Sequence, residues 1–174
     1  MNYFIGVDIG VTDGAIALLQ DQSLVEVTPI PTMQVLVGGK KRNQYDINGI
    51  NCIIKNWLNK YGKIKMAGME RLRAIPRQSS QTAFSMGGGS MLFKVLFTIN
   101  EIPFMEIEPS KWQHGIFDKL GIQYNRETTK IASVQAAKQL FPGFSFKPTE
   151  RCTTDSNGMT DAACIGLYIS QINQ

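Results

Sequence analysis

The chain has 174 residues, of which 43% are hydrophobic, and this size suits one domain (1–174) with a substantial core. It has a single histidine, His114, and three cysteines without CxxC spacing (Cys52, Cys152 and Cys164), which argues against zinc sites, a Ser-His-Asp triad and disulfides and predicts free buried thiols. No apolar run reaches the roughly 18–20 residues of a membrane span, and no basic region precedes the first apolar stretch. We therefore expect no membrane segment, no signal peptide and a cytosolic location.

The net charge of +4 is unevenly distributed along the chain. Residues 1–37 carry four acids and no Lys or Arg, residues 38–77 carry ten basic and two acidic side chains, and residues 78–174 carry eight of each. A basic block beside an acidic one indicates a polyanion-binding surface next to a cation site. On charge alone, a solvated basic face without function fits equally well.

The hydrophobic pattern predicts a mixed sheet that is covered by helices on both faces. In chain order we expect strands at 3–9, 15–19 and 24–30, a loop or hairpin at 31–45, a helix from Asp46 to Tyr61, a strand at 64–70, a helix from Ser79 or Ser80 to about Asn100, a strand at 103–108, and helices at 110–119, 126–141 and 160–172, the last with Thr160 as its N-cap. The first three strands follow each other after short links and form an antiparallel meander.

Two of the helices have features that predict their packing. Gly87-Gly88-Gly89 interrupts the helix that ends near Asn100, at about 1 kcal/mol per glycine relative to alanine, which suggests that another backbone approaches closely there. In the helix at 126–141 we expect Ile131, Val134 and Leu140 to face inward.

Three acids occupy positions where a carboxylate is unusual. Asp8 lies in an apolar strand, and a buried carboxylate costs several kcal/mol unless it is paired or binds a cation; the alternative is a structural Asp that accepts from turn amides at 10–14. Glu70 ends the strand at 64–70. Asp161 heads the stripe of the last helix that packs on the sheet, although an ordinary first-turn Asp is also favoured by the helix dipole.

Converging on one spot, these acids would repel one another and raise each other's pKa values, and divalent cations would remove that penalty. Hard oxygen ligands without a nearby histidine or cysteine favour Mg²⁺ or Mn²⁺ over zinc. Two such ions, roughly 4 Å apart, can activate a water and stabilise the leaving oxygen of a phosphodiester. The three acids and the basic block therefore predict a metal-dependent nuclease.

Four segments in order along the chain resemble the RuvC family of Holliday junction resolvases. GVDIGVTDGAIAL resembles the opening motif, a strand ending in Asp followed by a glycine-containing turn and a second strand. MAGMERLRAIP before a glycine-rich helix resembles the second motif, in which a Glu ends a strand before a dimerisation helix. EPSKWQ and then TTKIASVQAAKQLFP resemble the region after that helix, and GMTDAACIGLY the closing motif. The divergence is similar to that of phage-encoded relatives.

The resemblance implies an α/β, RNase H-like fold with a five-stranded sheet, three antiparallel strands and then two parallel ones. It also implies a crossover junction endodeoxyribonuclease with two Mg²⁺ or Mn²⁺ ions, held by Asp8, Glu70 and Asp161. The family has a fourth acid shortly before the closing Asp, where this chain has Asn157 and Gly158. Either Asp155 reaches the site from the preceding loop or Asn157 supplies a neutral oxygen; we favour Asp155, because a second metal needs charge.

Basic residues are expected to hold the DNA, mainly through its phosphates. The resemblance places Lys111 and Lys130 beside the site, with Lys130 as a catalytic candidate, although both suit ordinary surface lysines. Arg71, Arg73 and Arg77 follow Glu70 directly, and Lys40, Lys41 and Arg42 lie on the segment at 31–45.

The helix at 80–100 is expected to form the interface of a symmetric homodimer that presents two sites to the two-fold symmetric junction, since its apolar residues exceed one face. A fully buried helix of a monomer is the alternative. Phe84 near its start has the chemistry of a wedge between bases, but packing in the core is the favoured prediction.

Three other functions fit parts of the pattern. A sugar kinase or actin-like ATPase also begins with a strand, an Asp and a Gly/Thr turn, but it needs a second domain with a second copy of the motif. Another RNase H-like nuclease would act on RNA–DNA hybrids or as an integrase. A silent junction binder would explain the missing fourth acid.

Overall fold

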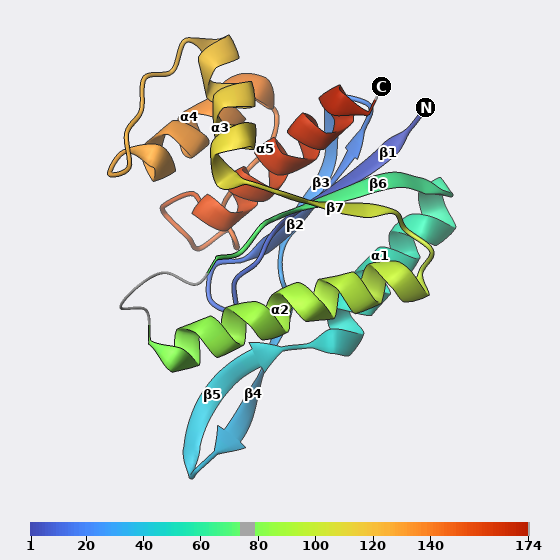
Figure 1. Cartoon of the computed structure of the whole chain (residues 1–174), viewed down its shortest axis with the longest axis vertical. Helices are drawn as coiled ribbons and strands as arrows, with labels where there is room; N and C mark the ends of the chain where they lie inside the picture. The colour runs from blue at the N-terminus through green and yellow to red at the C-terminus, as the bar shows by residue number, and fades with distance from the viewer. Residues whose placement is uncertain (74–78, 174) are drawn as a thin grey trace.

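The computed structural model describes residues 1–73 and 79–173. Within these residues a five-stranded sheet has helices on both faces (Figure 1). The elements are β1 (Tyr3–Asp8), β2 (Ala15–Gln20), β3 (Ser23–Pro29), β4 (Thr32–Val37), β5 (Lys40–Tyr45), α1 (Ile47–Tyr61), β6 (Ile64–Glu70), α2 (Ser80–Ile99), β7 (Phe104–Ile107), α3 (Pro109–Phe117), the 3₁₀ turn η1 (Asp118–Leu120), α4 (Thr129–Leu140) and α5 (Asn157–Ile172).

The strand order is β3-β2-β1-β6-β7, with β1, β2 and β3 antiparallel and with β6 and β7 parallel to β1. The predicted sheet is thus confirmed. Side chains of β1 alternate between two cores: Ile5 and Val7 face the cluster with α1 and α2, and Phe4 faces the cluster with α3, α4 and α5. A strand buried on both faces explains why its sequence is continuously apolar.

Two glycines let α5 lie directly on β1. A Cβ added at Gly6 would lie 2.0 Å from the carbonyl oxygen of Ala162 and 2.4 Å from the amide nitrogen of Gly166. Any side chain at residue 6 would therefore push the helix off the sheet. This contact fixes the height of the first turns of α5 above the end of β1.

The segment at 31–45 is a hairpin, one of the two predicted forms. Its strands β4 and β5 pair only with each other among the described residues, and they extend from the body past α2 (Figure 1). Asp46 then caps α1 by accepting a hydrogen bond from the amide of Gly49, at 3.0 Å.

Several packing predictions are wrong. A Cβ on Gly87 or Gly88 would meet nothing within 4 Å, and at Gly89 the nearest atoms are side-chain atoms of Tyr45 and Ile9. Within the described part of the chain, the nearest contacts of these glycines are therefore not with another backbone. In α4, Ile131 is 67% exposed, because small residues face α5 instead. They are Ala132, Ser133, Ala136 and Ala137. Small side chains allow the two helices to approach closely.

The last helix begins one turn earlier than predicted. Ser156 is its N-cap, accepting from the amide of Met159, while Thr160 lies fully buried inside the helix. The cysteine prediction holds in part: all three thiols are free, but Cys52 is exposed and Cys164 alone among them is buried.

Helix α2 is apolar on two sides. Phe93 and Phe97 are fully buried against the sheet, whereas its outer side leaves large apolar side chains exposed: Phe84, Met91, Val95 and Ile99. Phe84 is 85% exposed, so the prediction of core packing is wrong for this residue. Among the described residues, α2 is the one helix that is long and apolar enough to cross a membrane by length and composition alone. Its buried half nevertheless belongs to the core of the domain.

Candidate functional site

Asp8 and Glu70 lie beside each other at the carboxyl ends of two neighbouring parallel strands. The register pairs Val7 of β1 with Met69 of β6, and each acid follows one residue later. Asp161 comes to the same place from α5, which packs on β1 through Gly6. The charges of Glu70 and Asp161 both act on Asp8. The structure therefore brings the three acids singled out in the sequence together.

Asp8 lies in surroundings that disfavour its charged form. Burial raises its pKa well above the ordinary value of 3.8, and the charges of Asp161, Glu70 and Asp13 raise it further, against a smaller lowering by Lys130. Among the described residues no donor gives its carboxylate a hydrogen bond, so turn amides do not satisfy it as the structural alternative requires. A partly buried carboxylate among other acids, without a hydrogen-bond donor among the described residues, is stabilised by a cation.

Asp161 is oriented by a hydroxyl group from the neighbouring helix. Burial raises its pKa to about 7, with smaller contributions from the charges of Glu70 and Asp13. The Ser133 hydroxyl of α4 donates a hydrogen bond to Oδ1 of Asp161, which lowers the pKa. The small residues of α4 are what let Ser133 reach this carboxylate.

Glu70 is oriented by an indole. Nε1 of Trp112 donates to Oε1 of Glu70 at 2.7 Å, which lowers the pKa of Glu70 against the larger raising effect of its burial. Trp112 is fully buried in α3 and packs edge-on against Phe117, with ring centroids 5.5 Å apart. The Trp of the EPSKWQ segment thus holds the acid at the end of β6.

A cavity of about 880 Å³ opens above Asp8 and Asp161. Its wall comes from five parts of the chain: the end of β1 with the turn after it, the hairpin, the first turns of α2, the start of α4 and the start of α5. The basic residues in that wall are Lys41, Arg42 and Lys130. An acidic floor with a basic wall suits a phosphodiester strand lying above bound cations.

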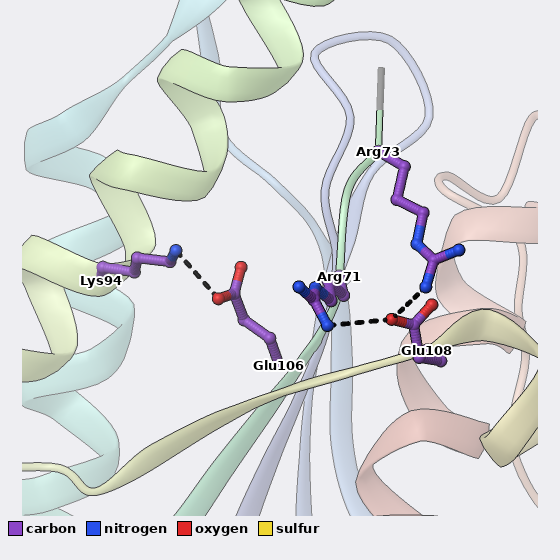
Figure 2. A network of polar contacts seen from close by, with 5 residues as sticks. All are labelled: Arg71, Arg73, Lys94, Glu106 and Glu108. Atoms are coloured by element: carbon purple, nitrogen blue, oxygen red, sulfur yellow. Dashed lines mark hydrogen bonds and ion pairs between the residues drawn. The ribbon is translucent and has the colours of Figure 1, made fainter. Parts of the chain in front are cut away.

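The predicted basic residues separate into groups. Lys41, Arg42 and Lys130 line the cavity, whereas Lys40 and Lys111 do not. Figure 2 shows the ion pairs of Arg71 and Arg73 with Glu108, whose Oε1 lies 3.2 and 2.7 Å from their guanidinium nitrogens. The side chains of the two arginines are 60% and 70% exposed. Both arginines are thus partly neutralised at the surface. Arg77 lies outside the described residues.

The two candidates for the fourth ligand differ in place. Oδ2 of Asp155 is 2.6 Å from Nζ of Lys138, and Asp155 does not line the cavity. Asn157 does line it. This arrangement does not favour Asp155, the residue preferred from the sequence.

Sequence reasoning passed over Asp13, Trp112 and Ser133. Asp13 lines the cavity, and its charge raises the pKa of both Asp8 and Asp161. Its contact Ser156 is 143 residues away in the chain, so no local signal marks it. Trp112 lies in a segment quoted for its resemblance, and a fully buried tryptophan needs an acceptor for its N–H, which was a usable signal.

The donor set fits Mg²⁺ or Mn²⁺ in its chemistry. Within residues 1–73 and 79–173 no group of three or more His, Cys, Asp or Glu side chains is arranged so that it could hold one ion. Mg²⁺ is commonly held by one or two carboxylates together with waters and substrate phosphates. Pairs of carboxylates around Asp8 would therefore suffice, with the DNA completing each coordination shell.

Comparison of the fold with solved structures gives extensive matches at low sequence identity. Thermus thermophilus RuvC in complex with Holliday junction substrate matches with a TM-score of 0.58 and 11% identity, over 97% of this chain and 92% of that one. The chain has a RuvC-like fold. A second Thermus thermophilus RuvC structure gives a TM-score of 0.55 and 11% identity, over 95% and 92% of the two chains.

The yeast mitochondrial Holliday junction resolvase Ydc2 matches with a TM-score of 0.52 and 13% identity, over 98% of this chain and 79% of that one. No family model matches the sequence, and the search of curated proteins found no match. The likeness to the RuvC-like proteins is therefore one of fold, at 11–13% sequence identity.

Proposed function

We propose that this protein is a metal-dependent endonuclease that cuts four-way and other branched DNA junctions. The observation that carries the proposal is the carboxylate of Asp8, which no described residue gives a hydrogen bond. It lines a basic-walled cavity together with Asp161, and the charge of Glu70 acts on it as well. The likeness to a RuvC structure bound to Holliday junction substrate supports branched DNA as the substrate class.

Each residue of the site would have a distinct role. Asp8, Glu70 and Asp161 would hold two Mg²⁺ or Mn²⁺ ions, which supply activation of water and stabilisation of the leaving oxygen at the scissile phosphate. Trp112 and Ser133 keep Glu70 and Asp161 aimed at that point. Lys130, whose charge already acts on Asp8 and Asp161, would face the phosphate.

The DNA strand would enter along the wall made by the hairpin and α2. Lys41 and Arg42 line the cavity there, so they are placed to neutralise phosphates next to the cleaved one. Lys40, Lys111 and the pair Arg71 and Arg73 would contact phosphates farther away. Binding of this kind is salt-dependent and has little sequence preference.

A homodimer through α2 is the second part of the proposal. The exposed residues Phe84, Met91, Val95 and Ile99 follow one another at intervals of seven, four and four residues, which places them on one side of the helix. Gly87 and Gly88 on that side have open space above them, so a second helix could come close. A symmetric pair would present two cavities to the two strands of a junction.

One substrate panel tests the proposal. The protein is incubated with an end-labelled four-way junction, a matching duplex and an RNA–DNA hybrid, each with Mg²⁺, Mn²⁺ or EDTA. We expect paired symmetric nicks on the junction that require metal. Cleavage confined to the hybrid would assign the protein to a different class of RNase H-like nuclease, and junction binding without cleavage would identify a silent binder.

A further inference from the structure

A further acid, Asp13, lines the cavity beside the start of α5. We infer that Asp13, in the turn after β1, supplies the fourth carboxylate for the metal ions. This inference rests on the proposed function, since it adds one ligand to the same site.

The close approach of the turn to α5 excludes a side chain at residue 158. A Cβ built on Gly158 would lie 1.6 Å from the carbonyl oxygen of Asp13 and 2.7 Å from its carbonyl carbon. Both are backbone atoms, which cannot move away as the end of a flexible side chain can. An acid at residue 158, shortly before the closing Asp, is therefore sterically excluded while the turn keeps this position. The same turn brings Asp13 to this place.

The side chain of Asp13 is held at the cavity by the start of α5. The hydroxyl of Ser156 donates to Oδ1 of Asp13 at 2.6 Å, and the oxygen of that hydroxyl accepts from the amide of Met159 as the helix cap. Oδ2 of Asp13 accepts no hydrogen bond from the described residues, so it is available as a ligand. A positioned carboxylate with one free oxygen is suited to bind a cation at its open side.

Asp8 indicates independently that a cation binds next to Asp13. The position of a Cβ on Gly158 lies 3.1 Å from Oδ2 of Asp8, so Asp8 and the backbone of Asp13 meet at the same glycine. Asp8 is partly buried, lines the cavity and has no hydrogen-bond donor among the described residues. Of the three candidates, Asp155 is held by Lys138 outside the cavity, and Asn157 brings no charge.

The test measures metal binding directly, apart from catalysis. Mn²⁺ is titrated into the full chain without DNA, and free Mn²⁺ is followed by electron paramagnetic resonance for the wild type, Asp13→Asn and the matched control Asp155→Asn. We expect Asp13→Asn to weaken binding about tenfold or more, as the loss of a metal-site residue typically does. Asp155→Asn should bind like the wild type.

Either of two results would overturn the inference. One is an Asp13→Asn protein that binds Mn²⁺ as the wild type does. The other is equal weakening in Asp13→Asn and Asp155→Asn, which would reveal only a general effect of negative charge. A wild-type chain that binds no Mn²⁺ in these titrations would instead remove the metal centre from the proposed function, so the two failures are distinguishable.

Discussion

The two sides of the cavity above Asp8 are built in different ways. On the acidic side, the packed core positions the carboxylates. Gly6 lets α5 pack directly on β1, and hydrogen bonds from Trp112 and Ser133 orient Glu70 and Asp161. On the basic side, Lys41 and Arg42 come from an exposed hairpin whose strands pair only with each other among the described residues.

This difference sets what each side can do. Chemistry at a phosphate needs ligands fixed to fractions of an ångström, and a packed core supplies that precision. Holding a polyanion needs charge more than geometry, and an exposed hairpin supplies it and can follow the shape of the DNA. We therefore expect single changes on the acidic side to abolish cleavage and changes on the basic side to have graded effects.

The largest effect is expected for Asp161→Asn. The amide keeps the size of the side chain and can still accept from Ser133, so folding should be preserved while cleavage falls by about 1000-fold or more with the loss of metal-held charge. Single-turnover cleavage of a labelled junction measures the rate, and Asp155→Asn is the control with the same change outside the cavity. Retained cleavage in Asp161→Asn would contradict the expectation that single changes on the acidic side abolish cleavage.

The acidic side should also make the metal-free protein sensitive to pH. The folded pKa of Asp161 is about 7 against an ordinary 3.8, so the folded state binds its proton more tightly. The contribution of Asp161 to the free energy of unfolding is fully present below about pH 4. It is lost as the pH rises through 7, at up to about 1.4 kcal/mol per pH unit.

Thermal unfolding in EDTA tests whether stability decreases as the pH rises. The melting temperature should rise as the pH is lowered from 7.5 to 5, and Mg²⁺ added at pH 7.5 should raise it as well. Asp161→Asn should flatten the pH dependence. A melting temperature that falls steadily over the same interval would contradict the account.

On the basic side, the triple change of Lys40, Lys41 and Arg42 to Ala should weaken junction binding about tenfold or more near 0.15 M salt. Every phosphate that is no longer neutralised by a basic side chain reduces the slope of log K against log salt by about one. Titrations at several salt concentrations measure both quantities. The rate of cleavage of fully bound junction should change little; a rate that falls as far as in Asp161→Asn would give the hairpin a part in the chemistry.

Trp112→Phe should have an intermediate effect on the acidic side. It removes the hydrogen bond that lowers the pKa of Glu70, and a bond to a charged group is worth roughly 1.5–3 kcal/mol. Cleavage should slow about tenfold, with the acid limb of its pH profile moved to higher pH and DNA affinity unchanged. An unchanged pH profile would show that the indole serves packing alone.

The smallest effect is expected for Glu108→Gln. Glu108 holds Arg71 and Arg73 on the surface, and its own pKa is lowered by Arg73 and then Arg71 (Figure 2). Releasing both arginines should tighten junction binding about twofold at low salt, since exposed ion pairs are weak. Glu106→Gln, which removes the neighbouring partner of Lys94, is the matched control. Weaker binding in Glu108→Gln would mean that the ion pairs hold the arginines in place for DNA.

The positions of the three acids could be predicted from the sequence, because a charge in an apolar strand has few explanations. Asp8, Glu70 and Asp161 all lie where strand and helix patterns placed them, although α5 begins at Ser156 and not at Thr160. Both residues are good caps, and nothing in the local pattern distinguishes them.

What the sequence could not give depends on contacts between distant residues. Asp13 sits in a polar turn that is exposed by every local criterion, and its role follows from the approach of Gly158. The same holds for α4, where small residues rather than Ile131 face inward because α5 is so near. The charge needed by a second metal favoured Asp155, but an ion pair with Lys138 holds its side chain, and Asp155 does not line the cavity.

The central claim is that the acids around Asp8 form a metal-dependent nuclease centre. The most direct measurement maps nicks on a labelled four-way junction for wild type and Asp8→Asn at equal fractions of bound DNA, with Mg²⁺ and with EDTA. We predict paired symmetric nicks for the wild type with Mg²⁺, none with EDTA, and none for Asp8→Asn under either condition. Nicks of the same pattern from Asp8→Asn, or from the wild type in EDTA, would contradict the account.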